Sequence, residues 1–190
     1  DFGHFHIRSG RINLDPDQMF REAPLRMLEI FRLALEQKAD LHPQALQRIT
    51  RGLHALGDAT RDDPRAANEF LAILTSRHNP ERVLRLMNES GVLGRFLPDF
   101  GKIVAMMQFD MYHSYTVDEH TIQVIGVLHQ IESGGLAKTA PVATSVMPEI
   151  ESRRALGVAA LRHDIAQGRV GDPSELGADV ALEVCPRLGL

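Results

Sequence analysis

The sequence is poor in cysteine, has no tryptophan and contains no long hydrophobic run. Cys185 is the only cysteine, which excludes an internal disulfide framework and a thiolate zinc site and suits a reducing compartment. No apolar run approaches the length of a membrane-spanning helix, and the first residues lack the basic-then-apolar pattern of a secretion signal. These absences predict a cytoplasmic protein with no membrane partner.

Charge of one sign is not in excess either. The 21 Lys and Arg residues stand against 25 Asp and Glu residues, giving a formal net charge of -4. The chain therefore lacks the overall basic character of proteins that bind nucleic-acid backbones, and we expect no nucleic-acid partner. Its 44% hydrophobic and 24% charged residues are ordinary for a globular protein.

Hydrophobic periodicity predicts an all-α fold with one small β element. Residues 2–14 alternate around a turn at Ser9 and Gly10, which predicts a β-hairpin that needs a further partner to be stable. Apolar residues then recur with helical spacing, and proline opens several of these stretches, as it does in the first turn of helices. The helices expected from this pattern cover about 24–35, 43–56, 64–77 and 80–90.

The second half of the chain follows the same helical pattern with more interruptions. Residues 91–101 are apolar but broken by Gly94 and Pro98, so we expect a short helical turn and a packed loop. Later helices are expected at about 118–133, capped by Asp118, and at about 149–166, joined by a flexible connection. A last helix is expected from about Pro173.

Three side chains suggest metal chemistry. His163 and Asp164 are adjacent at the end of an apolar run, and His120 lies on an earlier predicted helix. Histidine nitrogen and carboxylate oxygen can together hold a divalent metal that activates water. The doublet alone is weak evidence, because two residues recur by chance in many chains, and a lone helix histidine such as His120 more often bonds to a neighbour.

The other histidines and the arginines receive simpler interpretations. His4 and His6 fit a surface pair on one face of a strand, and His113 either lines the same cleft as His120 or packs in the core. The remaining histidines fit helix ends or the surface: His42, His54, His78 and His129. Several arginines with acids between them fit a solvated face: Arg51, Arg61, Arg65 and Arg77.

Several strings resemble the central region of the bifunctional PII uridylyltransferase/uridylyl-removing enzyme family. They are FREAPL at 20–25, NPERVLRLMN at 79–88, GVLGRF at 91–96, MQFDMYH at 107–113 and YTVDEHT at 115–121. The resemblance extends over nearly the whole chain. Because Asp1 is not an initiator methionine and the chain stops on apolar residues, we expect an internal segment of a longer protein.

The resemblance implies a division into three parts. Residues 1–14 would be a β-hairpin that ends the nucleotidyltransferase domain, 15–105 a helical linker domain, and 106–190 a partial HD-type helical domain. In that family one domain attaches uridylyl groups to the nitrogen-signalling protein PII and an HD domain removes them. The transferase motifs that hold metal and UTP are absent here, so UTP and UMP would be handled by a domain outside this sequence.

By the family's motif, His120, His163 and Asp164 are metal ligands, and His163 and Asp164 are catalytic. The metal would be Mg²⁺ or Mn²⁺, and the reaction would be hydrolysis of the phosphodiester that links a uridylyl group to PII. The sequence departs from the pattern at several positions: Gly157, Arg162, Gln167, Val170 and Pro173. We therefore expect impaired activity. A buried Arg162 would be costly unless it pairs or reaches solvent.

Two other functions compete with a hydrolase segment. One is a catalytically inactive helical scaffold that docks PII or positions neighbouring domains. The other is a relative of the tRNA nucleotidyltransferases, suggested by residues 20–34. The near-neutral charge and the string at 107–121 count against the second of these.

Overall fold

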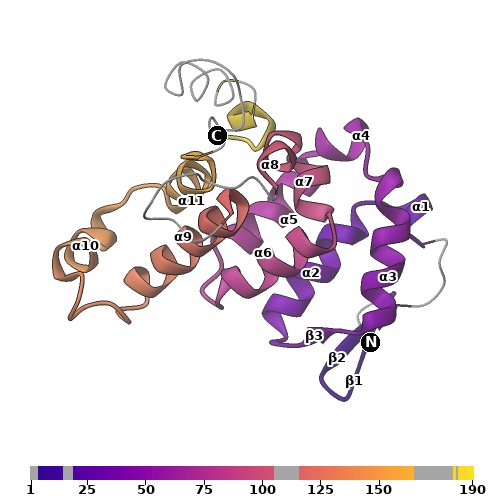
Figure 1. The fold of residues 1–190 in the computed structure, drawn as a ribbon, viewed down its shortest axis with the longest axis horizontal. Helices are drawn as coiled ribbons and strands as arrows, with labels where there is room; N and C mark the ends of the chain where they lie inside the picture. Colours follow the sequence, from indigo (N-terminus) through magenta and orange to yellow (C-terminus); the bar gives the residue numbers. More distant parts are fainter. Residues whose placement is uncertain (1–3, 15–18, 105–115, 165–181, 183) are drawn as a thin grey trace.

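The computed structural model describes residues 4–14, 19–104, 116–164, 182 and 184–190. A small sheet lies at the N-terminal end of a body built from helices, which confirms the predicted all-α bundle with a short hairpin (Figure 1). Predicted features at His113, Gln167, Val170 and Pro173 lie outside the described residues.

The sheet has three strands in the order β1 (Phe5–Arg8), β2 (Arg11–Leu14) and β3 (Asp40–Leu41). Strands β1 and β2 form the expected antiparallel hairpin, with Ser9 and Gly10 at positive φ in the turn. Strand β3 pairs with β2 in parallel and supplies the partner that the hairpin needs. Sequence patterning did not predict β3, because two residues are too few to show alternation.

The four helices predicted between residues 24 and 90 are present, together with short helices that the sequence did not predict. It comprises α1 (Met19–Glu22), α2 (Arg26–Glu36), α3 (Pro43–Gly52), η1 (Leu53–Ala55), α4 (Asp58–Arg61), α5 (Pro64–Leu74), α6 (Pro80–Glu89), α7 (Val92–Phe96) and α8 (Pro98–Ile103). Proline occupies the first position of α3, α5, α6 and α8, where its missing N–H has no helical partner to lose. Their core includes fully buried Phe31, Phe70, Phe96 and Phe100, and the rings of Phe70 and Phe96 lie 5.3 Å apart.

Helices α7 and α8 cover most of 91–101, where we expected a short helical turn followed by a packed loop. Gly94 and Gly101 let the two short helices touch through their backbones, because a Cβ on Gly94 would lie 3.0 Å from Gly101 Cα. The glycine that argued for a loop in the sequence is thus a contact point between helices.

The second group comprises α9 (Val117–Glu132), α10 (Pro141–Val146), η2 (Met147–Glu149) and α11 (Arg153–Arg162), and residues 184–187 are also helical. Helix α9 begins one residue before Asp118, so Asp118 lies in the first turn and not at the predicted cap. Helix α11 begins at Arg153, with Ser152 Oγ accepting from the Ala155 N–H, four residues later than expected.

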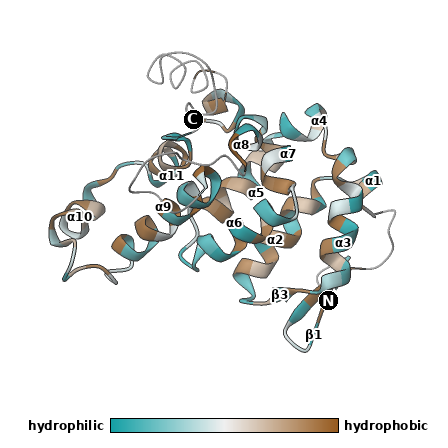
Figure 2. Ribbon diagram, viewed as in Figure 1, coloured by the Kyte–Doolittle hydropathy of each residue, from teal (hydrophilic) through white to brown (hydrophobic). Residues whose placement is uncertain are grey.

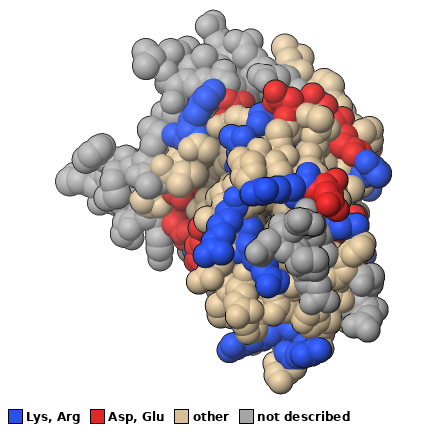
Figure 3. Space-filling view, turned by 90° about the vertical axis from the view of Figure 1, so that its right-hand side faces the viewer, with Lys and Arg blue, Asp and Glu red and all other residues tan. Residues whose placement is uncertain are grey.

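Helix α9 packs on α6, and α11 packs on α9 and α5 (Figure 1). Each helix carries hydrophilic and hydrophobic residues together (Figure 2). Basic and acidic side chains both occur on the face drawn in Figure 3. None of the helices in the described part of the chain is both long and apolar enough to cross a membrane.

Candidate metal centre

Polar contacts with α6 fix how α9 lies. Arg85 of α6 bonds to Glu119 of α9 and also to Glu81, at 2.8 Å. One turn further along, Asn88 Nδ2 donates to Asp118 Oδ2 at 2.8 Å, and Asp118 is 4% exposed. Asp118 and Glu119 come directly before His120 in the sequence, so the rotation of α9 about its axis, and with it the direction of His120, is set by α6.

Helix α11 is anchored at its start and closely packed in its middle. Arg153 donates to the carbonyl oxygen of Thr75 at 2.8 Å and pairs with Glu132 of α9. At Gly157 a Cβ would lie 3.3 Å from two side-chain atoms of Leu74, so glycine lets α11 approach α5. The end of α11 is therefore brought against α9 near His120.

The three predicted ligands meet at that point. His120 Nε2 lies 3.4 Å from Asp164 Oδ2, and His163 Nε2 lies 2.9 Å from the same oxygen. The two imidazole rings are 5.6 Å apart between centroids. One ligand atom from each residue lies within 4.8 Å of the other two. Asp164 is buried, His120 is half-buried and His163 is exposed.

A hydrogen bond from His163 Nδ1 orients the imidazole ring. His163 Nδ1 donates to the carbonyl oxygen of Ala160 at 2.6 Å, which turns Nε2 toward Asp164. The 2.9 Å between Nε2 and Asp164 Oδ2 fits either a shared proton or a shared cation. The donor set, two imidazole nitrogens and one carboxylate, is one that divalent metals accept.

Most of the other histidines lie where the sequence placed them. His42 caps α3, its Nδ1 accepting from the Gln44 N–H at 3.2 Å, and His54 and His78 are exposed. His4 is exposed but contacts Arg26 Nη2 at 2.6 Å. None of these joins the three-residue cluster within the described part of the chain.

The expectation of a solvated face is wrong for Arg61, whose side chain is only 16% exposed. Arg61 lines a cavity together with Arg162 and Arg187. Arg162 is partly buried, and its Nη1 lies 3.7 Å from Cys185 Sγ. Sequence reasoning missed this grouping, because the three arginines are far apart in the chain and follow no shared motif.

Comparison with known proteins points to one family. Residues 5–96 match the family described as "Uridylyltransferase GlnD third domain". The chain is 52% identical over 190 residues to the bifunctional uridylyltransferase/uridylyl-removing enzyme of Azospirillum brasilense, covering 100% of this chain and 20% of that protein. It is 51% identical over 188 residues to the enzyme of that name from Novosphingobium aromaticivorans, covering 99% and 21%.

A third relative of the same name, from Rhodospirillum rubrum, is 47% identical over 190 residues, covering 100% of this chain and 20% of that protein. The chain thus spans about a fifth of the length of these curated relatives. The resemblance inferred from the sequence strings is confirmed.

Proposed function

Because this chain belongs to the family of bifunctional uridylyltransferase/uridylyl-removing enzymes, we propose that it carries part of the centre that removes uridylyl groups. In this proposal His120, His163 and Asp164 bind one Mg²⁺ or Mn²⁺, and the substrate is the uridylylated form of PII. The proposal includes a cytoplasmic location. It also includes the division into the end of a nucleotidyltransferase domain (1–14), a helical linker (15–105) and a partial HD domain (106–190).

The convergence of the three ligand atoms from two helices is the observation that supports this proposal. His120 Nε2 and His163 Nε2 lie 3.4 and 2.9 Å from the same Asp164 oxygen, and the ligand atoms of all three residues lie within 4.8 Å of one another. Two imidazole nitrogens and one carboxylate oxygen at this spacing would hold a divalent metal. Ion pairs of protonated imidazoles with Asp164 would give similar distances, so metal binding itself is the deciding measurement.

Each of the three residues has a separate role. Asp164 supplies the negative charge that retains a cation in a buried position. His163 presents Nε2 because Ala160 holds Nδ1, an outer contact of the kind that orients ligand histidines. His120 is positioned through the contacts of α9 with Arg85 and Asn88. When bound, the metal supplies Lewis acidity, which lowers the pKa of water and offsets charge on a phosphodiester under attack.

Metal binding tests the proposal directly. We expect calorimetry to show Mn²⁺ binding by the full chain, weakened at least about 10–100-fold by His163→Ala or Asp164→Asn, since even outer contacts of metal ligands have effects of this size. His54→Ala is the matched control, because His54 is exposed and bonds through Nδ1 to the Arg51 carbonyl oxygen. In the full-length enzyme the same two substitutions should abolish release of UMP from uridylylated PII.

Two results contradict the proposal. One is Mn²⁺ binding that is unchanged in both His163→Ala and Asp164→Asn, which would place the metal elsewhere. The other is no binding by a folded parent chain, together with undiminished removal of uridylyl groups by the substituted full-length enzyme. The chain would then act as a helical scaffold that docks PII or positions neighbouring domains.

A further inference from the structure

The outward face of the N-terminal sheet carries a hollow of about 500 Å³. Every side chain that lines it is polar: His6, Arg8, Ser9, Arg11, Asn13 and His42. None of the three metal-ligand candidates is among them, and the sheet lies away from α11 (Figure 1). The sheet hollow is therefore separate from the candidate metal centre.

Strand register brings these side chains to one face of the sheet. Arg8 pairs with Arg11 across the hairpin, and His6 pairs with Asn13. Cross-strand partners point to the same face, and so do residues that are two apart along a strand. The opposite face packs in the core, where the buried residues are Phe5, Ile12, Leu14 and Leu41. The two guanidinium groups thus start from neighbouring positions and rise on the same side.

The two arginines form a like-charge pair with no acid between them. Both are exposed, and neither forms a hydrogen bond or ion pair with another described residue. Like charges directly opposite each other in a sheet are destabilising. Asp40 is the partner of Arg11 in β3, but its carboxylate pairs with Arg82 and does not line the sheet hollow. An anion bound between the two arginines would remove their repulsion.

The neighbouring side chains also present hydrogen-bond donors. Asn13 Oδ1 accepts from the Leu14 N–H at 3.0 Å, which leaves the Nδ2 amide group for a ligand. His42 Nδ1 accepts from the Gln44 N–H at 3.2 Å, so a neutral His42 ring carries its proton on Nε2. Among the described residues the sheet hollow is lined by donors and by no carboxylate.

The sequence around the sheet hollow is basic in a chain whose net charge is -4. Residues 4–14 and 41–57 contain no Asp or Glu, and their arginines are Arg8, Arg11, Arg48 and Arg51. Figure 3 shows basic side chains without acidic ones at the lower end of the molecule, where the hairpin lies in Figure 1. A local excess of one charge raises the concentration of counter-ions near it, so this end of the chain attracts anions.

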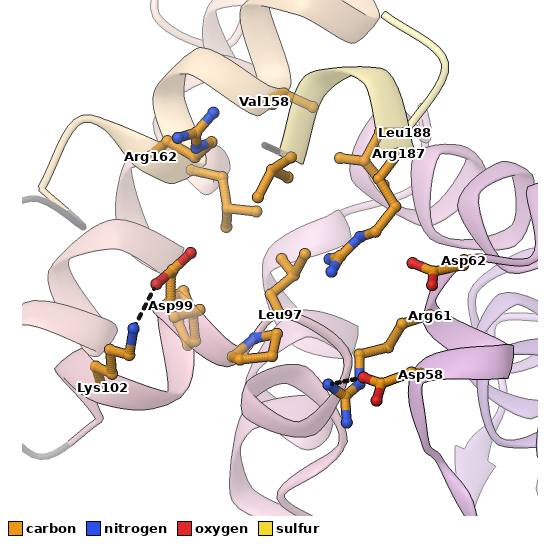
Figure 4. A pocket seen from close by; sticks show the side chains of 14 residues that line it. Asp58, Arg61, Asp62, Leu97, Asp99, Lys102, Val158, Arg162, Arg187 and Leu188 are labelled. Atoms are coloured by element: carbon orange, nitrogen blue, oxygen red, sulfur yellow. Dashed lines mark hydrogen bonds and ion pairs between the residues drawn. The ribbon is translucent and has the colours of Figure 1, made fainter. Parts of the chain in front are cut away.

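The cavity that Arg61 and Arg162 line does not offer the same arrangement. Those two side chains enter it from different helices, and apolar side chains such as Leu97 lie between them (Figure 4). In the sheet hollow the two guanidinium groups belong to directly opposed residues of one hairpin. One small anion can therefore contact both of them.

We propose that the sheet hollow binds a phosphate group, either as inorganic phosphate or as a phosphate monoester. A monoester carries a charge of about -1.5 to -2 at pH 7 and three acceptor oxygens, which suits two guanidinium groups with further N–H donors beside them. Arg8 and Arg11 bind the phosphate oxygens, and Asn13 and His42 contact the remainder of the ligand. The proposal goes beyond the metal centre and does not depend on it.

Nuclear magnetic resonance tests this site on the full chain, with metal removed by a chelating resin. The probes are inorganic phosphate and phenyl phosphate, and acetate is the control, with sodium chloride holding the ionic strength constant. We expect phosphate to shift the amide resonances of Ser9 and Gly10 in a saturable way at millimolar concentration, and acetate to leave them in place. The probe that binds more tightly shows whether the site prefers free phosphate or an ester.

Substitution then tests the two arginines. Arg8→Gln and Arg11→Gln should each weaken phosphate binding about tenfold or more, because a hydrogen bond to a charged group is lost. Without phosphate both variants should melt no lower than the parent, because the removed charge faced a like charge. This second measurement separates loss of binding from loss of folding. Arg154→Gln is the matched control, since Arg154 is exposed and does not line the sheet hollow.

Three results overturn the proposal. They are amide resonances that do not shift at millimolar phosphate, equal shifts with acetate, and an affinity that is unchanged in both Arg8→Gln and Arg11→Gln. Because the samples contain no metal, none of these results bears on the metal centre. Failure of the chain to bind Mn²⁺ would likewise leave the phosphate result standing.

Discussion

Replacing Gly126 with alanine probes the contact between α6 and α9 that positions His120. A Cβ at residue 126 would overlap Glu81 Oε2 and would lie 2.7 Å from Glu81 Cδ and 3.2 Å from Glu81 Cβ. The carboxylate can rotate away, but it then leaves Arg85, to which it is bonded at 2.8 Å. The Cβ contact is not relieved by rotation, so the two helices must also separate slightly.

The opposing effects can be compared in magnitude. Alanine in place of glycine inside a helix stabilises by about 1 kcal/mol. Loss of the partly exposed Glu81–Arg85 pair costs about 0.3–0.5 kcal/mol, and overpacking costs about 1–3 kcal/mol. The net expectation is destabilisation by about 0.3–2.5 kcal/mol. For a chain of this length that lowers Tm by about 3–6 °C at the middle of the range.

Thermal unfolding followed by circular dichroism measures this effect. Gly157→Ala is the matched control, because the atoms nearest to its Cβ would be those of Leu74 at 3.3 Å and Thr75 at 3.7 Å. There, the gain in helix propensity and a mild contact should offset each other to within about 0.5 kcal/mol.

A second background separates the clash from other causes. In a Glu81→Ala chain, Gly126→Ala should become neutral or stabilising, because most of the overlapping atoms are gone and neighbouring substitutions are not additive. The reasoning is refuted if Gly126→Ala is as stable as the parent, or if Glu81→Ala does not reduce its effect.

Three further results are expected. In thermal unfolding, Mn²⁺ at 100 times its Kd should stabilise the parent by about 2.7 kcal/mol, and Asp164→Asn should lose this stabilisation. Equal stabilisation of the parent and of Asp164→Asn by Mn²⁺ would count against the metal centre. Asn88→Ala should cost about 1–3 kcal/mol in urea unfolding, because the buried Asp118 carboxylate loses a donor; an unchanged midpoint would refute this. The side-chain and backbone hydrogen bonds from Arg65 hold the pKa of Asp63 below its usual 3.8. Ionised Asp63 therefore stabilises the folded chain at pH values above the pKa of this carboxyl in the unfolded chain, and this stabilisation is lost as pH falls through the lower pKa of the folded chain. The parent should be more stable than Asp63→Asn at pH 7 and should lose that advantage in acid. A stability difference that stays constant across pH would contradict this prediction.

Sequence reasoning predicted the helices because their signals are local. The prolines at the starts of α3, α5 and α6 and the apolar stripe of α2 each depend on residues within one or two turns. The meeting of His120 with His163 and Asp164 was inferred through the family resemblance, and the structure brings those residues together. Their roles as ligands and in catalysis stay predictions.

What the sequence did not reveal depends on contacts between distant segments. Strand β3 exists because the Asp40 N–H donates to the Gly10 carbonyl oxygen at 3.0 Å and the His42 N–H donates to the Ile12 carbonyl oxygen at 2.8 Å. A strand of two residues has no sequence pattern that would predict these bonds. Arg61 likewise lines a cavity with residues of α8, α11 and 184–188, a neighbourhood that spacing along α4 does not encode. Gly94 was interpreted from the sequence as a helix breaker. Its role in the close contact with Gly101 is visible only in the structure.

The C-terminal end of α11 leads both to the cavity and to the candidate metal centre. Arg162 ends the helix inside the cavity, and the next two residues, His163 and Asp164, close on His120. Consecutive residues on one turn share a backbone, so a displacement that begins at either place is transmitted to the other through covalent bonds.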